Sequence, residues 1–87
     1  MQIQTKFDPG QKVWINHIPY FKGELLPLRQ EEAEIACVEI WRSSKPLYFL
    51  SGGLKRAENE VHLTKEEAVA NSKQYERKIY DIYYKGA

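Results

Sequence analysis

The chain has a single cysteine, so no disulfide can form within it. A lone thiol is typical of a reducing compartment, and the apolar neighbours of Cys37, Ala36 and Val38, predict a buried and unreactive side chain rather than a nucleophile. The first ten residues, MQIQTKFDPG, lack the basic and apolar regions of a secretory signal. No apolar run approaches the roughly 20 residues of a membrane helix. We therefore expect a cytoplasmic protein with no membrane partner.

The sequence is also poor in groups that carry chemistry. Thirteen basic residues oppose twelve acidic ones, and these totals give no sign of a nucleic acid or an anionic membrane as the partner. The only two histidines, His17 and His62, lack the spacing of metal ligands to any neighbour. Gly52 and Gly53 form too short a glycine run to cradle a phosphate. These absences predict no enzyme activity, no cofactor and no metal.

The chain does have enough apolar sequence for one small core. Its 87 residues, 43% of them hydrophobic, predict a single domain over 1–87. The most apolar stretch, residues 33–50, has the pattern of a β-hairpin that is apolar on both faces, with a polar turn over 42–46. Side chains of its first strand alternate between the faces, with Ile35, Cys37 and Trp41 on one and Ala36, Val38 and Ile40 on the other.

A turn and a first strand precede this hairpin. Asp8-Pro9-Gly10 predicts a turn, because proline fixes φ and glycine accepts positive φ. The turn leads into a strand over 12–16 with Val13 and Ile15 on its core face. Residues 17–29 combine strand-breaking prolines and a glycine with many apolar side chains. We expect a long irregular loop that folds back over the core, with an exposed interface as the alternative.

Shorter elements follow the hairpin. Residues 54–57 read as a basic loop, and residues 58–63 as a strand with Val61 and Leu63 facing inward and His62 facing outward. The predicted core comprises Val13, Ile15, Val38, Ile40, Tyr48, Leu50, Val61 and Leu63.

The last third of the chain predicts a helix over 64–85. Thr64 followed by Glu67 is a capping box, in which each side chain satisfies a free backbone N–H. An apolar stripe recurs at helical spacing and consists of Ala68, Ser72, Tyr75, Ile79 and Ile82. We expect this stripe to lie on the second face of the hairpin, against Trp41 and Phe49.

The order of these elements resembles that of small SH3-like barrel proteins, in which a strand opens with a phenylalanine, a turn glycine and a lysine-valine-aromatic step. This chain has FDPGQKVW over 7–14. A second stretch, EVHLTKEEA over 60–68, looks like the strand-to-helix junction of short uncharacterised proteins carried by phages, prophages and gut bacteria. The resemblance implies a mostly β protein of phage or mobile-element origin: a small SH3-like β-barrel or strongly curved antiparallel sheet over 7–63, with one C-terminal helix over 64–85 packed on it.

The loops around the hairpin supply the candidate partner-binding residues. These residues are aromatic or basic, and they are Tyr20, Phe21, Lys22, Arg29, Lys55 and Arg56. Since aromatic anchors dominate protein interfaces, we predict a protein-interaction module whose partner is an unidentified protein, a host protein if the chain is phage-encoded. Tyr80, Tyr83 and Tyr84 at the helix end offer further anchors. The alternatives are a KOW/Tudor-like module that binds nucleic acid by stacking and phosphate contact, and self-association as a homodimer or larger homo-oligomer.

Overall fold

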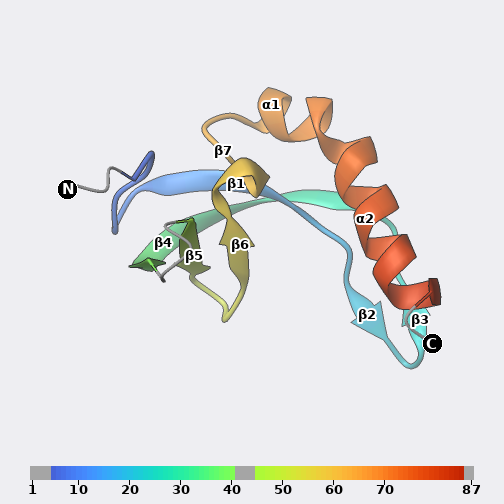
Figure 1. Cartoon of the computed structure of the whole chain (residues 1–87). Coiled ribbons are helices and arrows are strands. Elements are labelled where there is room, and N and C mark those ends of the chain that lie inside the picture. Colours follow the sequence, from blue (N-terminus) through green and yellow to red (C-terminus); the bar gives the residue numbers. More distant parts are fainter. Residues whose placement is uncertain (1–4, 41–44, 86–87) are drawn as a thin grey trace.

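The structure, a computed structural model, describes residues 5–40 and 45–85. Within them, five strands form an antiparallel sheet in the order β6-β5-β4-β1-β7, and two strands form a separate hairpin (Figure 1). The strands are β1 (Lys12–His17), β2 (Tyr20–Phe21), β3 (Glu24–Leu25), β4 (Arg29–Ile40), β5 (Pro46–Leu50), β6 (Lys55–Ala57) and β7 (Val61–His62). A 3-10 helix, η1 (Glu58–Glu60), and two α-helices, α1 (Lys65–Ala70) and α2 (Ser72–Lys85), complete the described elements.

The long strand β4 organises the sheet. Its first half pairs with β1, starting with Arg29 opposite His17, and its second half pairs with β5. The sheet curls into a half-barrel whose two edges are β6 and β7, with η1 between them along the chain. The predicted fold class is thereby confirmed as a strongly curved antiparallel sheet with the C-terminal helical segment packed on it. Trp41 and residues 42–44 of the predicted turn lie outside the described residues.

The core lies within the curl of the sheet, and its buried hydrophobic residues are Phe7, Val13, Ile15, Ala33, Ile35, Tyr48, Leu50 and Val61. The inward positions predicted for Val13 and Ile15 are confirmed, since neither is exposed. Tyr48 is also fully buried, and its ring packs edge-on against Phe7. The Tyr48 hydroxyl accepts a hydrogen bond from the Phe7 N–H (3.2 Å) and donates one to the Glu58 carboxylate (2.7 Å). The largest core side chain therefore buries its polar atom with both functions satisfied.

Cys37 is exposed, contrary to the prediction of a buried thiol. The pairing of β4 with β5 skips Ala36, which makes this residue a β-bulge. One extra residue shifts the alternation of side chains, so Ile35 and Val38 share the inner face while Cys37 turns to solvent. Ile40, predicted to be in the core, is 39% exposed at the end of β4. The hairpin is thus apolar on one buried face only.

Two short elements near the open edges also differ from the prediction. Residues 54–57 contain strand β6 rather than a loop, and residues 58–60 form η1 rather than a strand. Val61 is buried as predicted, but His62 is only 7% exposed and Leu63 is 51% exposed, the reverse of the predicted orientation. Leu63 is exposed because β7 ends at His62 and strand alternation does not extend further, whereas His62 is buried because α1, which follows it in the chain, lies against β7.

Thr64 caps α1 as predicted, since its hydroxyl accepts from the Glu67 N–H at 3.2 Å. The Glu67 carboxylate accepts from the Leu63 N–H at 3.1 Å, one residue before the position that a standard capping box uses. α1 contacts β1, β4 and β7 and buries Ala68 completely. The Asn16 side chain donates to the Ala68 carbonyl at 2.9 Å and fixes the helix on β1.

Asn71 separates α1 from α2. Its side-chain amide donates to the Glu67 carbonyl at 2.8 Å, a local hydrogen bond that competes with a regular helix. α2 then leaves the sheet and runs toward the β2–β3 hairpin (Figure 1). The predicted stripe therefore packs only in part: Tyr75 and Ile79 are half-buried, while Ile82 is 62% exposed.

Residues 17–29 contain a small hairpin rather than an irregular loop. Lys22 and Gly23 form its two-residue turn, and both have the positive φ (51° and 83°) that such a turn requires. The expectation that this segment covers the core is wrong, because only Ile18 is buried and both residues of β2 are 59% exposed. The hairpin and α2 project from the sheet and give the molecule an elongated shape of 42 × 27 × 23 Å.

Candidate functional site

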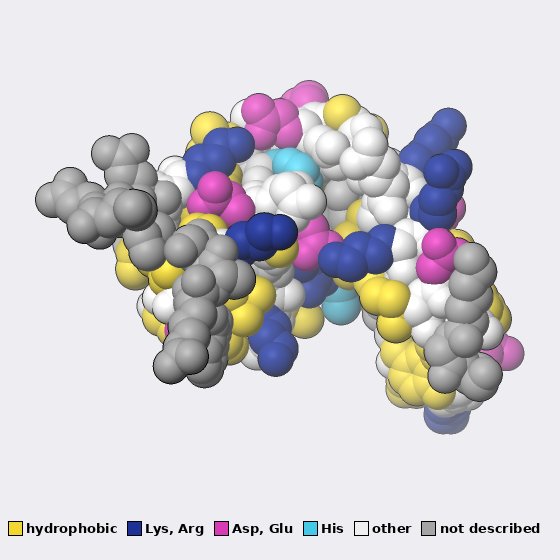
Figure 2. Space-filling view, viewed as in Figure 1, with side chains coloured by type: hydrophobic (Ala, Val, Ile, Leu, Met, Phe, Trp, Pro, Cys, Tyr) yellow, Lys and Arg dark blue, Asp and Glu magenta, His cyan; other side chains and the backbone are white. Residues whose placement is uncertain are grey.

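The structure separates the predicted partner-binding residues. Tyr20, Phe21 and Lys22 lie together on the β2–β3 hairpin at one end of the molecule, where hydrophobic side chains gather (Figure 2). Arg29 begins β4, and its guanidinium is ion-paired with Glu31. Lys55 and Arg56, the remaining two residues of the predicted set, lie on β6 at the edge of the sheet. One end of the molecule thus holds the aromatic part of the predicted set.

The end of α2 adds tyrosines to the hairpin residues. We call this surface the aromatic tip, and it consists of Tyr20, Phe21, Tyr80, Tyr83 and Tyr84. The Tyr83 ring lies 5.5 Å from that of Tyr20 and 5.0 Å from that of Tyr84, measured between centroids. The Tyr83 hydroxyl donates to the Gly23 carbonyl at 2.8 Å, and its hydrogen bonding with Tyr20 raises the pKa of Tyr83. Two segments some 60 residues apart in sequence are therefore joined through Tyr83.

The aromatic tip is solvent-exposed despite these contacts. Tyr20 and Phe21 are each 59% exposed and Tyr84 is 64% exposed. The Lys22 ammonium lies 5.3 Å from the centre of the Phe21 ring, a cation–π distance. Glu24, on the facing strand, is also exposed, so charges of both signs border the rings.

Arg56 has a structural position in the fold. Its guanidinium donates to the Asn16 carbonyl (3.2 Å) and the Tyr75 hydroxyl (3.0 Å), and lies 3.4 Å from Nδ1 of His17. It also lies 5.3 Å from the centre of the Tyr75 ring, so it joins β6 to β1 and α2. We call this arrangement the arginine clip. Lys55, the neighbouring strand residue, is exposed while Arg56 is half-buried, so the two cations do not form one patch.

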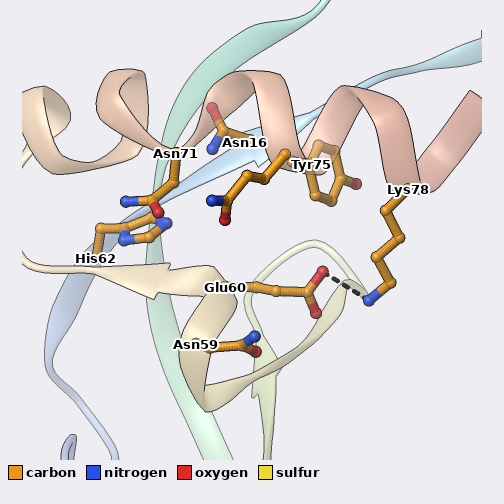
Figure 3. A pocket seen from close by; sticks show the side chains of 8 residues that line it. Asn16, Asn59, Glu60, His62, Asn71, Tyr75 and Lys78 are labelled. Atoms are coloured by element: carbon orange, nitrogen blue, oxygen red, sulfur yellow. Dashed lines mark hydrogen bonds and ion pairs between the residues drawn. The ribbon is translucent and has the colours of Figure 1, made fainter.

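A polar pocket of about 190 Å³ lies between the sheet and the helices (Figure 3). Asn16, Asn59, Glu60 and His62 line it from the sheet side, and Asn71, Gln74, Tyr75 and Lys78 from the helix side. The Lys78 ammonium and the Glu60 carboxylate form an ion pair at 2.9 Å, drawn as a dashed line in Figure 3. The charges of the pocket are thereby paired with each other, and the remaining groups are amides, a phenol and an imidazole.

His62 is the most buried of the side chains in this pocket that lack a polar partner. It is 7% exposed, and within residues 5–40 and 45–85 its ring makes no hydrogen bond. Burial lowers the pKa of His62, with Glu67 opposing and Lys6 assisting, so the ring is neutral at pH 7. His62 therefore presents one donor and one acceptor to the pocket.

The sequence-based prediction missed this pocket. Gln74, Tyr75 and Lys78 lie three, four and seven residues after Asn71, which places all four on one helix face. This polar stripe shares Tyr75 with the apolar stripe, and it is the feature of the sequence that could have indicated the pocket. The facing residues, Asn16 and His62, carry no such signal, because their burial depends on how the helices cross β1 and β7.

The chain matches no family model, no curated protein and no solved structure. The SH3-like resemblance and the phage origin therefore stay predictions. In the part of the chain that the structure describes, no group of three or more His, Cys, Asp or Glu side chains is arranged to hold a metal ion. None of the described helices is long and apolar enough to cross a membrane.

Proposed function

We propose that this chain is a small non-enzymatic protein-interaction module of phage or mobile-element origin, and that the aromatic tip is its contact surface. The observation that carries the proposal is that exposed rings from two distant segments are gathered and held at one end of the fold. A fold that needed these rings for its core would bury them.

The aromatic tip has the composition of an interface. Tyrosine and phenylalanine are enriched at the centres of protein interfaces, where large flat rings bury much area with few rotatable bonds. Here the contacts of Tyr83 with Tyr20 and Tyr84 already restrict the rings. Binding then loses less side-chain entropy, because part of the ordering has been done by folding.

The nucleic-acid alternative has less support. A cation that binds phosphate must reach solvent, but the Arg56 guanidinium is engaged in the arginine clip. Lys55 remains exposed, and at the aromatic tip Lys22 is accompanied by the acidic Glu24. This alternative predicts a mobility shift with DNA or RNA that weakens steeply with salt and is reduced in the Lys55→Glu variant.

Affinity capture from a nuclease-treated lysate of the host tests the preferred function. The bait proteins are the natural chain, a tip variant with Phe21→Ser and Tyr84→Ser, and a matched control with Leu63→Ser and Val69→Ser. All four positions hold large hydrophobic residues that are 49–64% exposed, so both variants change the solubility of the surface similarly. We expect a specific protein to be recovered with the natural chain and the control, and at least tenfold less with the tip variant.

Two results would contradict this function. One is that no specific protein is recovered; the other is that the tip variant recovers the same protein as well as the control does. A second copy of the chain is the remaining alternative partner. It would appear as a dimer by light scattering that the tip variant returns to a monomer.

A further inference from the structure

The polar pocket contains groups that the fold already uses. The Asn16 amide donates to the Ala68 carbonyl and accepts from the Gln30 amide, so both of its functions are engaged. The Tyr75 hydroxyl accepts from Arg56. The Glu60 carboxylate accepts from Lys78 and from the Ala57 N–H. These side chains form walls rather than free contact points.

Other groups in the same pocket have unused capacity. In the described part of the chain, the amides of Asn59 and Gln74 and the ring of His62 make no hydrogen bond. Asn71 uses only its amide nitrogen, which donates to the Glu67 carbonyl. An amide offers donors and an acceptor, and a neutral imidazole offers one of each. The pocket therefore presents both kinds of hydrogen-bonding group without a net charge.

The charge pattern selects against ions. An anion near Lys78 would also meet the Glu60 carboxylate 2.9 Å from that ammonium, and a cation near Glu60 would meet Lys78. A neutral ligand avoids both conflicts. The half-buried ring of Tyr75, which lines one wall, adds an apolar face suited to a flat molecule.

Size narrows the choice further. About 190 Å³ corresponds to roughly six water molecules and is smaller than the pockets of about 300–1,000 Å³ that hold drug-sized ligands. Nucleobases are flat, neutral molecules with mixed donor and acceptor edges, and proteins bind them with Asn or Gln side chains and an aromatic face.

We propose that the polar pocket binds the uncharged base of a nucleoside whose sugar lies at the mouth. Asn59, Gln74 and His62 would contact the base edge, and Tyr75 its face. This inference does not rest on the protein-interaction function, because the pocket and the aromatic tip share no residue.

Titration of the full chain with adenosine, guanosine, cytidine and uridine tests the inference. The readouts are calorimetry and the NMR signals of the His62 ring. We expect at least one nucleoside to give saturable heat and a matching shift of the His62 signals. Gln74→Leu and Asn59→Leu should each weaken that binding about tenfold, the effect of losing one good hydrogen bond.

The two pocket variants and their control all change exposed residues, where substitutions are tolerated. Gln74 and Asn59 are exposed, so their variants should fold, and circular dichroism checks this. Tyr84→Ser, at the aromatic tip, should leave nucleoside binding unchanged. The inference is overturned if none of the four nucleosides binds, which means that the pocket holds water only. The inference is equally overturned if nucleoside binding persists in both pocket variants, or if Tyr84→Ser weakens that binding as much as the pocket variants do. Binding of glucose without binding of any nucleoside would also overturn it.

Discussion

The sheet end and the hairpin end of this molecule use tyrosine in opposite ways. Tyr48 is fully buried under Phe7, and its hydroxyl has both a donor and an acceptor partner. Tyr84 is 64% exposed and touches the rings of Tyr80 and Tyr83. The same side chain is a core residue at one end and a surface group at the other.

The difference indicates which residues the fold depends on. Stabilisation by burial amounts to about 25 cal/mol per Å² of apolar area removed from water, so a residue that stays exposed adds little. The aromatic tip is therefore available for binding without loss of the core. Three substitutions, each with a matched control, and one change of pH test this division, in order of decreasing expected effect.

Tyr48→Ala should lower the free energy of unfolding by about 3–5 kcal/mol, because it leaves a cavity in the core and removes the hydrogen-bond acceptor of the buried Phe7 N–H. That is a large share of the 5–15 kcal/mol of a typical domain. Tyr84→Ala is the matched control and should change stability by no more than about 0.5 kcal/mol. Urea unfolding of both variants gives the values. Equal losses would mean that the tip is part of the core.

Ala68→Leu should cost about 1–3 kcal/mol, because Ala68 is fully buried where α1 lies on the sheet and a larger side chain overpacks that contact. Ala70→Leu, on the exposed side of the same helix, should be neutral within about 0.5 kcal/mol. Thermal unfolding compares the two. If both variants were neutral, the packing of α1 on the sheet would be disproved.

Arg56→Met should cost about 1–2 kcal/mol, since it removes the charge-assisted bonds of the arginine clip to Asn16 and Tyr75. The control is Lys55→Met, at the neighbouring position of the strand, which should leave the free energy of unfolding almost unchanged. The substitution should accelerate amide hydrogen exchange more in the first turns of α2 than in β1. Unchanged exchange in α2 would show that other contacts hold this helix.

Acidification should destabilise the sheet end modestly. Burial is the main cause that lowers the pKa of both His17 and His62 below the ordinary value of 6.5, so the unfolded chain binds protons more readily. The contribution of each histidine is full above pH 6.5 and is lost as the pH falls from there toward the folded-state pKa. Urea unfolding between pH 7.5 and 5.5 should show this decline.

The variant His62→Gln separates this effect from the titration of carboxylates. It should flatten the dependence of stability on pH in that range, while capture of a protein partner by the aromatic tip should not change between the same pH values. A pH dependence as steep as in the natural chain would show that His62 does not contribute.

Patterns local in sequence predicted the fold well. Val13 and Ile15 alternate in an ordinary strand, and the turn at residues 8–10 has the expected bond from the Gln11 N–H to the Asp8 carbonyl. Thr64 precedes a helix with its cap in place. In each case the signal and the structure depend on residues fewer than five apart.

The misses share a physical cause, which is that distant contacts reset a local pattern. The bulge at Ala36 reverses the face of Cys37, and only the register with β5 reveals it. The β2–β3 hairpin had a signal, the pair Lys22-Gly23, but prolines on both sides favoured an irregular loop. His62 is buried by helices that follow it in the chain, so no pattern around it could show its pocket.

The open half-barrel also bears on aggregation. Unpaired sheet edges can recruit strands of other molecules, and a closed barrel avoids this by having no edge. Here the two edge strands are β6 with three residues and β7 with two, and the exposed Lys55 lies on β6. Such short edges offer few backbone groups for another strand to pair with. The sheet can therefore stay open and still resist edge-to-edge polymerisation. Association with another molecule then depends on side-chain contacts rather than on backbone hydrogen bonds.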